Sequence, residues 1–100
     1  MRALVLGLCL VAAGAHAETP PSQPVVMYAT SWCPYCAKAR AYFTRNRIAY
    51  VEHDVEKSAA ARAEFRRLGG RGVPLILVGR ERLDGFDELA FEFALQKASR

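Results

Sequence analysis

Two cysteines separated by two residues constrain this chain more than any other feature. Cys33 and Cys36 stand just after an apolar run at residues 25–28 and just before a segment of helical composition at residues 37–46. A Cys-x-x-Cys pair at the junction of a strand and a helix is typical of thiol redox chemistry. The spacing therefore predicts a reactive dithiol at the start of a helix.

The predicted helix gives the two sulfurs different environments. With Cys33 as the N-cap, Pro34 takes the first helical position, where a missing N–H costs no hydrogen bond. The free N–H groups and the positive end of the helix dipole then face the Cys33 sulfur and favour its thiolate. We expect the Cys33 sulfur to be exposed, and Cys36 to be deeper and suited to resolving a mixed disulfide.

The first 17 residues are predicted to be a signal peptide that does not belong to the folded domain. Arg2 supplies a short basic region, and residues 3–13 are apolar but too few to span a bilayer comfortably. Residues 15–17 read Ala-His-Ala, an A-x-A cleavage site before Glu18. An uncleaved membrane anchor or a buried helix is the alternative. Cleavage predicts an exported, periplasmic protein with no membrane attachment, in a compartment where a Cys-x-x-Cys pair can form a disulfide.

Apolar runs and turn residues divide the rest of the 100-residue chain. Residues 18–24 are polar and rich in proline, which predicts a flexible leader to one domain at residues 25–100. Strands are predicted at residues 25–29, 48–54, 75–78 and 81–83. Helices are predicted from residue 34 or 35 to 46, at residues 58–68, and from residue 86 or 87 to 97. The order β-α-β-α-β-β-α predicts an α/β fold, a four-stranded mixed sheet with three flanking helices. Four consecutive apolar residues at 75–78 predict burial on both faces, and Leu89 and Phe93 are expected to face the core.

Charge does not indicate a nucleic-acid partner. The formal net charge is +4, but the basic residues are spread along the chain and no nucleic-acid motif accompanies them. We therefore expect solvated helix faces and no nucleic acid.

Three interpretations of the dithiol are open from the residues alone. Its place at a helix start favours redox activity, whereas a purely structural disulfide would close a small, strained ring. A structural zinc site needs four ligands, and downstream of residue 17 only His53, expected at a strand edge, joins the two cysteines as a nitrogen or sulfur ligand. The remaining alternative is a thiol module without catalysis that holds a soft metal, Cu(I) or an iron–sulfur cluster.

Taken together, the motifs resemble the glutaredoxin family. The resemblance rests on Cys-Pro-Tyr-Cys at residues 33–36, Val73-Pro74 before a buried strand and Gly-Phe-Asp at residues 85–87 before the last helix. It implies a thioredoxin-like fold and thiol–disulfide oxidoreductase activity, with Cys33 as nucleophile and Cys36 as resolving thiol. It also implies a cis Pro74 beside the dithiol and no tightly bound cofactor. We expect a monomer whose partners are disulfide-bearing proteins or glutathione mixed disulfides, together with an upstream thiol donor.

The same resemblance implies a site for glutathione, as co-substrate, next to the dithiol. The Val73 backbone would pair with the incoming peptide, and Gly85, Phe86 and Asp87 would hold its γ-glutamyl end. Asp87 would contact the ammonium group, and Arg71 is the candidate for the glycine carboxylate. Trp32 and Tyr35 flank the cysteines and are expected to form an apolar rim.

Three residues depart from the family pattern. Thr30 stands where many glutaredoxins have lysine, and Gly72 stands where threonine usually precedes Val-Pro. Phe86 replaces a small or polar residue, as in glutaredoxin-like electron donors that depend on thioredoxin reductase. These differences leave open whether glutathione or a protein reductase supplies the electrons.

Overall fold

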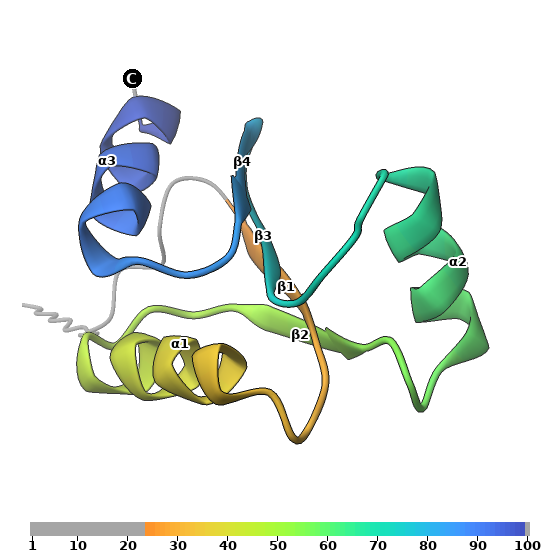
Figure 1. Cartoon of the computed structure of the whole chain (residues 1–100). Coiled ribbons are helices and arrows are strands. Elements are labelled where there is room, and N and C mark those ends of the chain that lie inside the picture. Colours follow the sequence, from red (N-terminus) through yellow and green to blue (C-terminus); the bar gives the residue numbers. More distant parts are fainter. Residues whose placement is uncertain (1–23, 100) are drawn as a thin grey trace, which may run out of the picture.

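Four strands and three helices make up residues 24–99, the part of the chain that the computed structural model describes (Figure 1). In chain order they are β1 (Val25–Ala29), α1 (Pro34–Arg45), β2 (Val51–Asp54), α2 (Ala59–Arg67), β3 (Leu75–Val78), β4 (Glu81–Asp84) and α3 (Glu88–Ala98). The predicted order of elements is confirmed. The predicted signal peptide and residues 18–23 of the predicted leader lie outside the described residues.

The strands form one mixed sheet in the order β2-β1-β3-β4. β1 runs parallel to β2, with Val26 opposite Val51, whereas β3 runs antiparallel to both β1 and β4. A parallel pair needs a crossover, which α1 supplies, while β3 and β4 are joined by a tight turn at residues 79–80. The predicted four-stranded mixed sheet is confirmed.

The two faces of the sheet are covered by different helices, α1 and α3 on one side and α2 on the other (Figure 1). Successive strand residues point to opposite faces. Met27 and Ile76 therefore belong to the larger core under α1 and α3, and Tyr28 and Leu75 belong to the smaller core under α2. The prediction that residues 75–78 are buried on both faces is confirmed.

Each helix begins at a side chain that accepts a hydrogen bond from the backbone of its first turn, which satisfies an otherwise free N–H group. These N-caps are Cys33, Ser58 and Asp87, and the donors are the N–H groups of Cys36, Ala61 and Ala90. The caps place the helices one or two residues inside the predicted ranges at their starts, except for α1, which begins at Pro34 as predicted.

The second strand is shorter than predicted, because it begins at Val51 rather than at residue 48. The chain leaves α1 in a tight turn, in which Arg47 has a φ of 56° and the Ile48 N–H donates to the Phe43 carbonyl. Ile48 and Tyr50 still pack against the larger core from this irregular segment. Their apolar character reflects burial and not membership of a strand.

The prediction that Leu89 and Phe93 face the core is wrong. They are 76% and 62% exposed, whereas Phe91 and Ala94 of the same helix are buried. α3 carries apolar residues on two sides, and residues three or four apart share a face on either of them. The spacing alone therefore fits both orientations of the helix.

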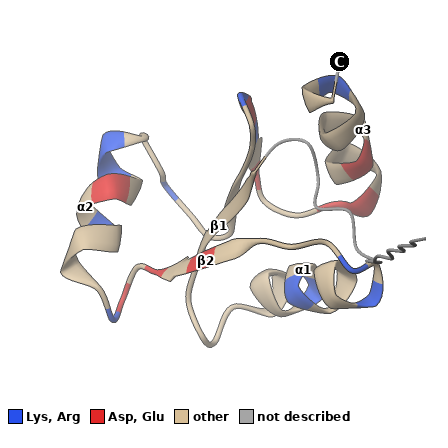
Figure 2. Cartoon of the chain, turned by 180° about the vertical axis from the view of Figure 1, so that it is seen from behind, with Lys and Arg blue, Asp and Glu red and all other residues tan. Residues whose placement is uncertain are grey.

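Charged residues are distributed over most elements. Figure 2 shows Lys and Arg on α1, on α2 and at the end of α3, and Asp and Glu on β2, α2 and α3. None of the helices within residues 24–99 has the length and apolar character that crossing a bilayer requires.

Candidate active site

The two cysteines lie at the N-terminus of α1. Cys33 is the N-cap, with an extended backbone (φ −75°, ψ 120°), and its sulfur accepts a hydrogen bond from the Cys36 N–H at 3.2 Å. Pro34 occupies the first helical position, where it displaces no hydrogen bond. Both thiols are free. The helix therefore presents its positive end to the Cys33 sulfur.

Cys33 is more enclosed than expected. Only 4% of the residue is exposed, and Cys36 is fully buried. The Cys33 thiol donates to the Val73 carbonyl oxygen over 3.6 Å, so the loop before β3 lies directly against it. The expectation of an exposed sulfur is wrong for the free thiol, because this loop covers it. A substrate has to approach between the loop and α1.

Burial gives Cys36 a protonated resting state. Removal from water raises the pKa of the Cys36 thiol to about 12, and its hydrogen bond with Cys33 acts in the same direction. A backbone hydrogen bond from Thr30 and the charge of Arg40 lower that pKa. Cys36 thus holds its proton at neutral pH, as suits a thiol that acts second.

The loop beside the dithiol contains the cis Val73–Pro74 peptide bond that the resemblance implies. The Pro74 carbonyl accepts a hydrogen bond of 2.9 Å from the Gly85 N–H. This bond ties the loop before β3 to the segment between β4 and α3.

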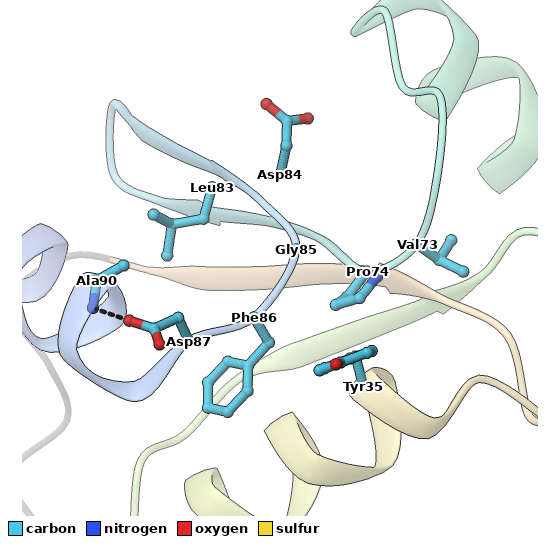
Figure 3. Close-up of a pocket in the computed structure, with 9 residues that line it drawn as sticks. All are labelled: Tyr35, Val73, Pro74, Leu83, Asp84, Gly85, Phe86, Asp87 and Ala90. Carbon is cyan, nitrogen blue, oxygen red and sulfur yellow. Dashed lines mark hydrogen bonds between the residues drawn. The ribbon is translucent and has the colours of Figure 1, made fainter.

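A pocket of about 310 Å³ opens next to the dithiol (Figure 3). Its lining comes from α1, from the loop before β3 and from the end of β4 through the start of α3: Tyr35, Val73, Pro74, Leu83, Asp84, Gly85, Phe86, Asp87 and Ala90. Figure 3 shows the Tyr35 and Phe86 side chains along one side of the pocket and Leu83 and Asp84 along the other. Three motifs that are distant in the chain therefore meet around one cavity, as the sequence predicts.

Two side chains at one end of this pocket are held by local contacts. Asp87 caps α3, and its Oδ2 accepts a hydrogen bond of 2.9 Å from the Ala90 N–H (Figure 3). The Phe86 ring packs against Tyr42 and Phe43, with centroid separations of 5.6 and 6.1 Å. Phe86 is therefore a fixed wall between the larger core and the pocket.

Two of the residues predicted to bind substrate or glutathione lie outside the pocket. Arg71 lines a second hollow, of about 550 Å³, that shares the Val73–Pro74 loop and includes Arg82. Trp32 is 65% exposed, and its indole N–H donates to Glu56 over 3.0 Å. Of the two predicted rim aromatics, only Tyr35, which is 55% exposed, lines the pocket itself.

His53 is remote from the dithiol in the layered fold. It lies on the edge strand β2, and its ring is 5.2 Å from that of Tyr28, which belongs to the core under α2. The predicted strand-edge position is confirmed. In the described part of the chain, no group of three or more His, Cys, Asp or Glu residues is arranged to hold a metal ion.

Arg40 is the polar residue near the dithiol that sequence reasoning missed. Its guanidinium forms a two-pronged ion pair with Glu52 of β2, with Nη2–Oε2 at 2.7 Å and Nε–Oε1 at 2.9 Å, and donates to the Thr30 carbonyl at 3.0 Å. Arg40 and Glu52 lie on different elements, and the spacing of residues along the chain does not predict that they pair. Asp84 of the pocket was also missed, although its place directly before the Gly-Phe-Asp motif is a signal that could have found it.

A thioredoxin-like sheet with two free thiols at a helix start and a Val–Pro loop beside them defines the class of thiol–disulfide oxidoreductases. The glutaredoxin family model matches residues 25–83. Over 78 residues the chain is 36% identical to a glutaredoxin of Pseudomonas aeruginosa, a match that covers 77% of this chain and 89% of the relative. The chain belongs to the glutaredoxin family.

Solved structures support the same fold. A mutant of a thioredoxin-like protein superposes with a TM-score of 0.67 at 29% identity, covering 72% of this chain and 94% of that one. Buckwheat glutaredoxin in complex with glutathione superposes with a TM-score of 0.60 at 21% identity, covering 79% and 78% of the two chains. The predicted family, fold class and thiol–disulfide oxidoreductase activity are confirmed.

Proposed function

We propose that Cys33 and Cys36 carry out the thiol–disulfide exchange of this glutaredoxin-family protein. The position of Cys33 is the observation that carries the proposal. Its sulfur caps α1 at 3.2 Å from the Cys36 nitrogen and contacts the Val73 carbonyl at 3.6 Å. A sulfur at the positive end of a helix, with a second thiol one turn away, has the two partners that exchange requires.

In this mechanism the Cys33 thiolate attacks one sulfur of a substrate disulfide, the S–S bond breaks, and the departing thiolate takes a proton from solvent. The product is a mixed disulfide at Cys33. Cys36 then loses its proton and attacks the Cys33 sulfur, which releases the second substrate thiol and closes a Cys33–Cys36 disulfide. Two electrons pass from the protein to the substrate. An upstream thiol donor then supplies two electrons that reduce the Cys33–Cys36 disulfide again.

The direct test uses serine at each position. Cys33→Ser should abolish reduction of a glutathionylated peptide, because the attacking sulfur is gone. Cys36→Ser should still attack and should accumulate a mixed disulfide that mass spectrometry detects. Full activity of a folded Cys33→Ser protein would rule this mechanism out.

Glutathione is the electron donor that we propose. The pocket beside the dithiol offers the Val73 backbone for the peptide and the Asp87 carboxylate for an ammonium group, and α3 begins at this pocket, where the N-terminus of a helix suits a carboxylate. Arg71, in the adjoining hollow, is the candidate for the second carboxylate. The soft-metal alternative is not favoured by membership of the glutaredoxin family.

Reduced glutathione, glutathione reductase and NADPH provide the corresponding assay. The oxidised protein should be reduced in this mixture, and NADPH consumption should require the glutathione. If thioredoxin reductase with NADPH reduces the protein and glutathione does not, the donor is a protein. That result would agree with the presence of Phe86, which this chain shares with glutaredoxin-like electron donors that depend on thioredoxin reductase.

We also propose that residues 1–17 direct export and are removed before Glu18. The basic residue, the apolar stretch and the Ala-His-Ala site support this proposal. Expression of the full chain in a Gram-negative host should yield a periplasmic product whose intact mass begins at Glu18. A product that keeps residue 1 and stays in the cytoplasm would contradict the proposal.

A further inference from the structure

We propose that Arg40 is a positioning residue of the dithiol site, which holds the Thr30 backbone against Cys36 and keeps a fixed positive charge one helical turn from that sulfur. Arg40 would thereby govern how fast Cys36 resolves a mixed disulfide. The inference rests on the proposed roles of Cys33 and Cys36 and adds a residue to which neither the motifs nor the pocket assigns a task.

The first observation is how completely the Arg40 guanidinium is held. Its Nε lies 2.9 and 3.0 Å from the two Glu52 carboxylate oxygens, and its Nη2 lies 2.7 Å from Oε2 and 3.0 Å from the Thr30 carbonyl. The two side chains are 29% and 27% exposed. Two-pronged arginine–carboxylate pairs fix direction as well as distance. Arg40 therefore joins α1, β2 and the loop that leads to the cysteines.

The second observation connects this pair with Cys36. Cys36 and Arg40 are four residues apart on α1, so they lie on one face of the helix, a turn from each other. Thr30, whose carbonyl Arg40 holds, makes a backbone hydrogen bond to Cys36. The Thr30 hydrogen bond and the Arg40 charge both favour the negative form of the Cys36 sulfur, which is fully buried and loses the stabilisation that water would give it.

The chemistry affected is the second step of exchange. Cys36 must give its proton to solvent before its sulfur can attack the Cys33 sulfur, break the mixed S–S bond and expel the substrate thiolate. Arg40 stabilises the thiolate that carries out this attack. It has no contact with the Cys33 sulfur among the described residues, so the first step should be insensitive to it.

A disulfide reagent with a coloured leaving group separates the two steps. The reduced protein attacks bis-nitrothiobenzoate through Cys33 and releases one coloured thiolate; Cys36 then displaces the second. Stopped-flow absorbance should show two phases. In Arg40→Met the second phase should slow about three- to tenfold, as expected for loss of a partly buried charge near a thiolate, while the first stays within about twofold.

Three matched variants separate positioning from simple stapling of α1 to β2. Arg45→Met removes the arginine of an exposed ion pair on the same helix, at 3.2 Å from Glu88, and should leave both phases unchanged. Glu52→Gln breaks the Arg40 pair but keeps the positive charge, so the second phase should not slow. Arg40→Lys should lower the urea midpoint yet keep the second phase close to that of the unmodified protein.

An unchanged second phase in a folded Arg40→Met protein, or equal slowing by Glu52→Gln and Arg40→Met, would overturn the inference. Failure of the proposed function looks different, because a Cys33→Ser protein, in which Cys36 is the remaining thiol of the pair, would then release the first coloured thiolate as fast as the unmodified protein does.

Discussion

At the scale of single residues, the depth of Cys36 gives the reaction a pH dependence. Burial raises the pKa of this thiol to about 12, and only the thiolate attacks. Below its pKa, the thiolate fraction grows about tenfold per pH unit. The rate at which Cys36 resolves a mixed disulfide should therefore rise with pH throughout the neutral and mildly alkaline range. Single-turnover release of a chromogenic thiol measures it, and a flat profile would show that another group limits this step.

Asp87 caps α3 and has a second, proposed role in binding glutathione, and substitution can separate the two. As the N-cap of α3 it accepts the Ala90 N–H, and as a carboxylate in the pocket it can contact an ammonium group. Asp87→Ala should lower the free energy of unfolding by about 1 kcal/mol, whereas serine is itself a good N-cap and should largely preserve it. Both variants should raise the KM for glutathione. A KM for Asp87→Ser equal to that of the unmodified protein would show that the carboxylate serves only as a cap.

At the scale of elements, α3 offers a matched comparison of its two apolar sides. Phe91 is fully buried, while Leu89 and Phe93 are 76% and 62% exposed. Phe91→Ala should lower the free energy of unfolding by about 3–5 kcal/mol through lost burial and a residual cavity. Leu89→Ala and Phe93→Ala should each change it by no more than about 0.5 kcal/mol. Urea unfolding checks the ranking, and equal losses at all three positions would contradict this orientation of α3.

The same helix shows where sequence patterns succeed and where they stop. Existence and order of the elements were predictable, because caps such as Ser58 and the uninterrupted apolar run of β3 are local signals. Which side of α3 faces the core was not predictable, because apolar residues lie on both sides of the helix. Tertiary packing decides which side is buried. The start of β2 was also hidden, because Ile48 and Tyr50 are buried by an irregular segment and not by strand pairing.

At the scale of the whole molecule, the site arises where segments distant in the chain converge. The motifs at residues 33–36, 73–74 and 85–87 could be placed together in advance, because the resemblance to a known family carries their arrangement. The enclosure of Cys33 by the Val73 carbonyl and the link from Arg40 to Glu52 could not. Both are contacts between residues of different segments, and the spacing of residues along the chain does not predict how close those residues lie in the fold.

The reduction potential of the dithiol depends both on the contacts of single residues and on how the elements pack around the two sulfurs. A strongly oxidising pair, near about −120 mV, requires heavy stabilisation of its reduced form, whereas glutaredoxins fall near about −200 to −230 mV. Here the Cys33 sulfur accepts one backbone N–H within the described residues, Thr30 supplies no charge, and the Arg40 charge is shared with Glu52.

We therefore expect the Cys33–Cys36 pair to equilibrate with glutathione buffers in the glutaredoxin range, as a reductant or exchanger of disulfides and not as a strong oxidant. Quantifying the oxidised fraction by thiol alkylation across a series of glutathione ratios measures the potential, with Arg45→Met as a variant that should not move it. A value near that of a strong oxidant would mean that the folded protein stabilises the reduced dithiol through contacts beyond the single N–H at Cys33. Electron flow in an exported protein would then run toward making disulfides in its substrates.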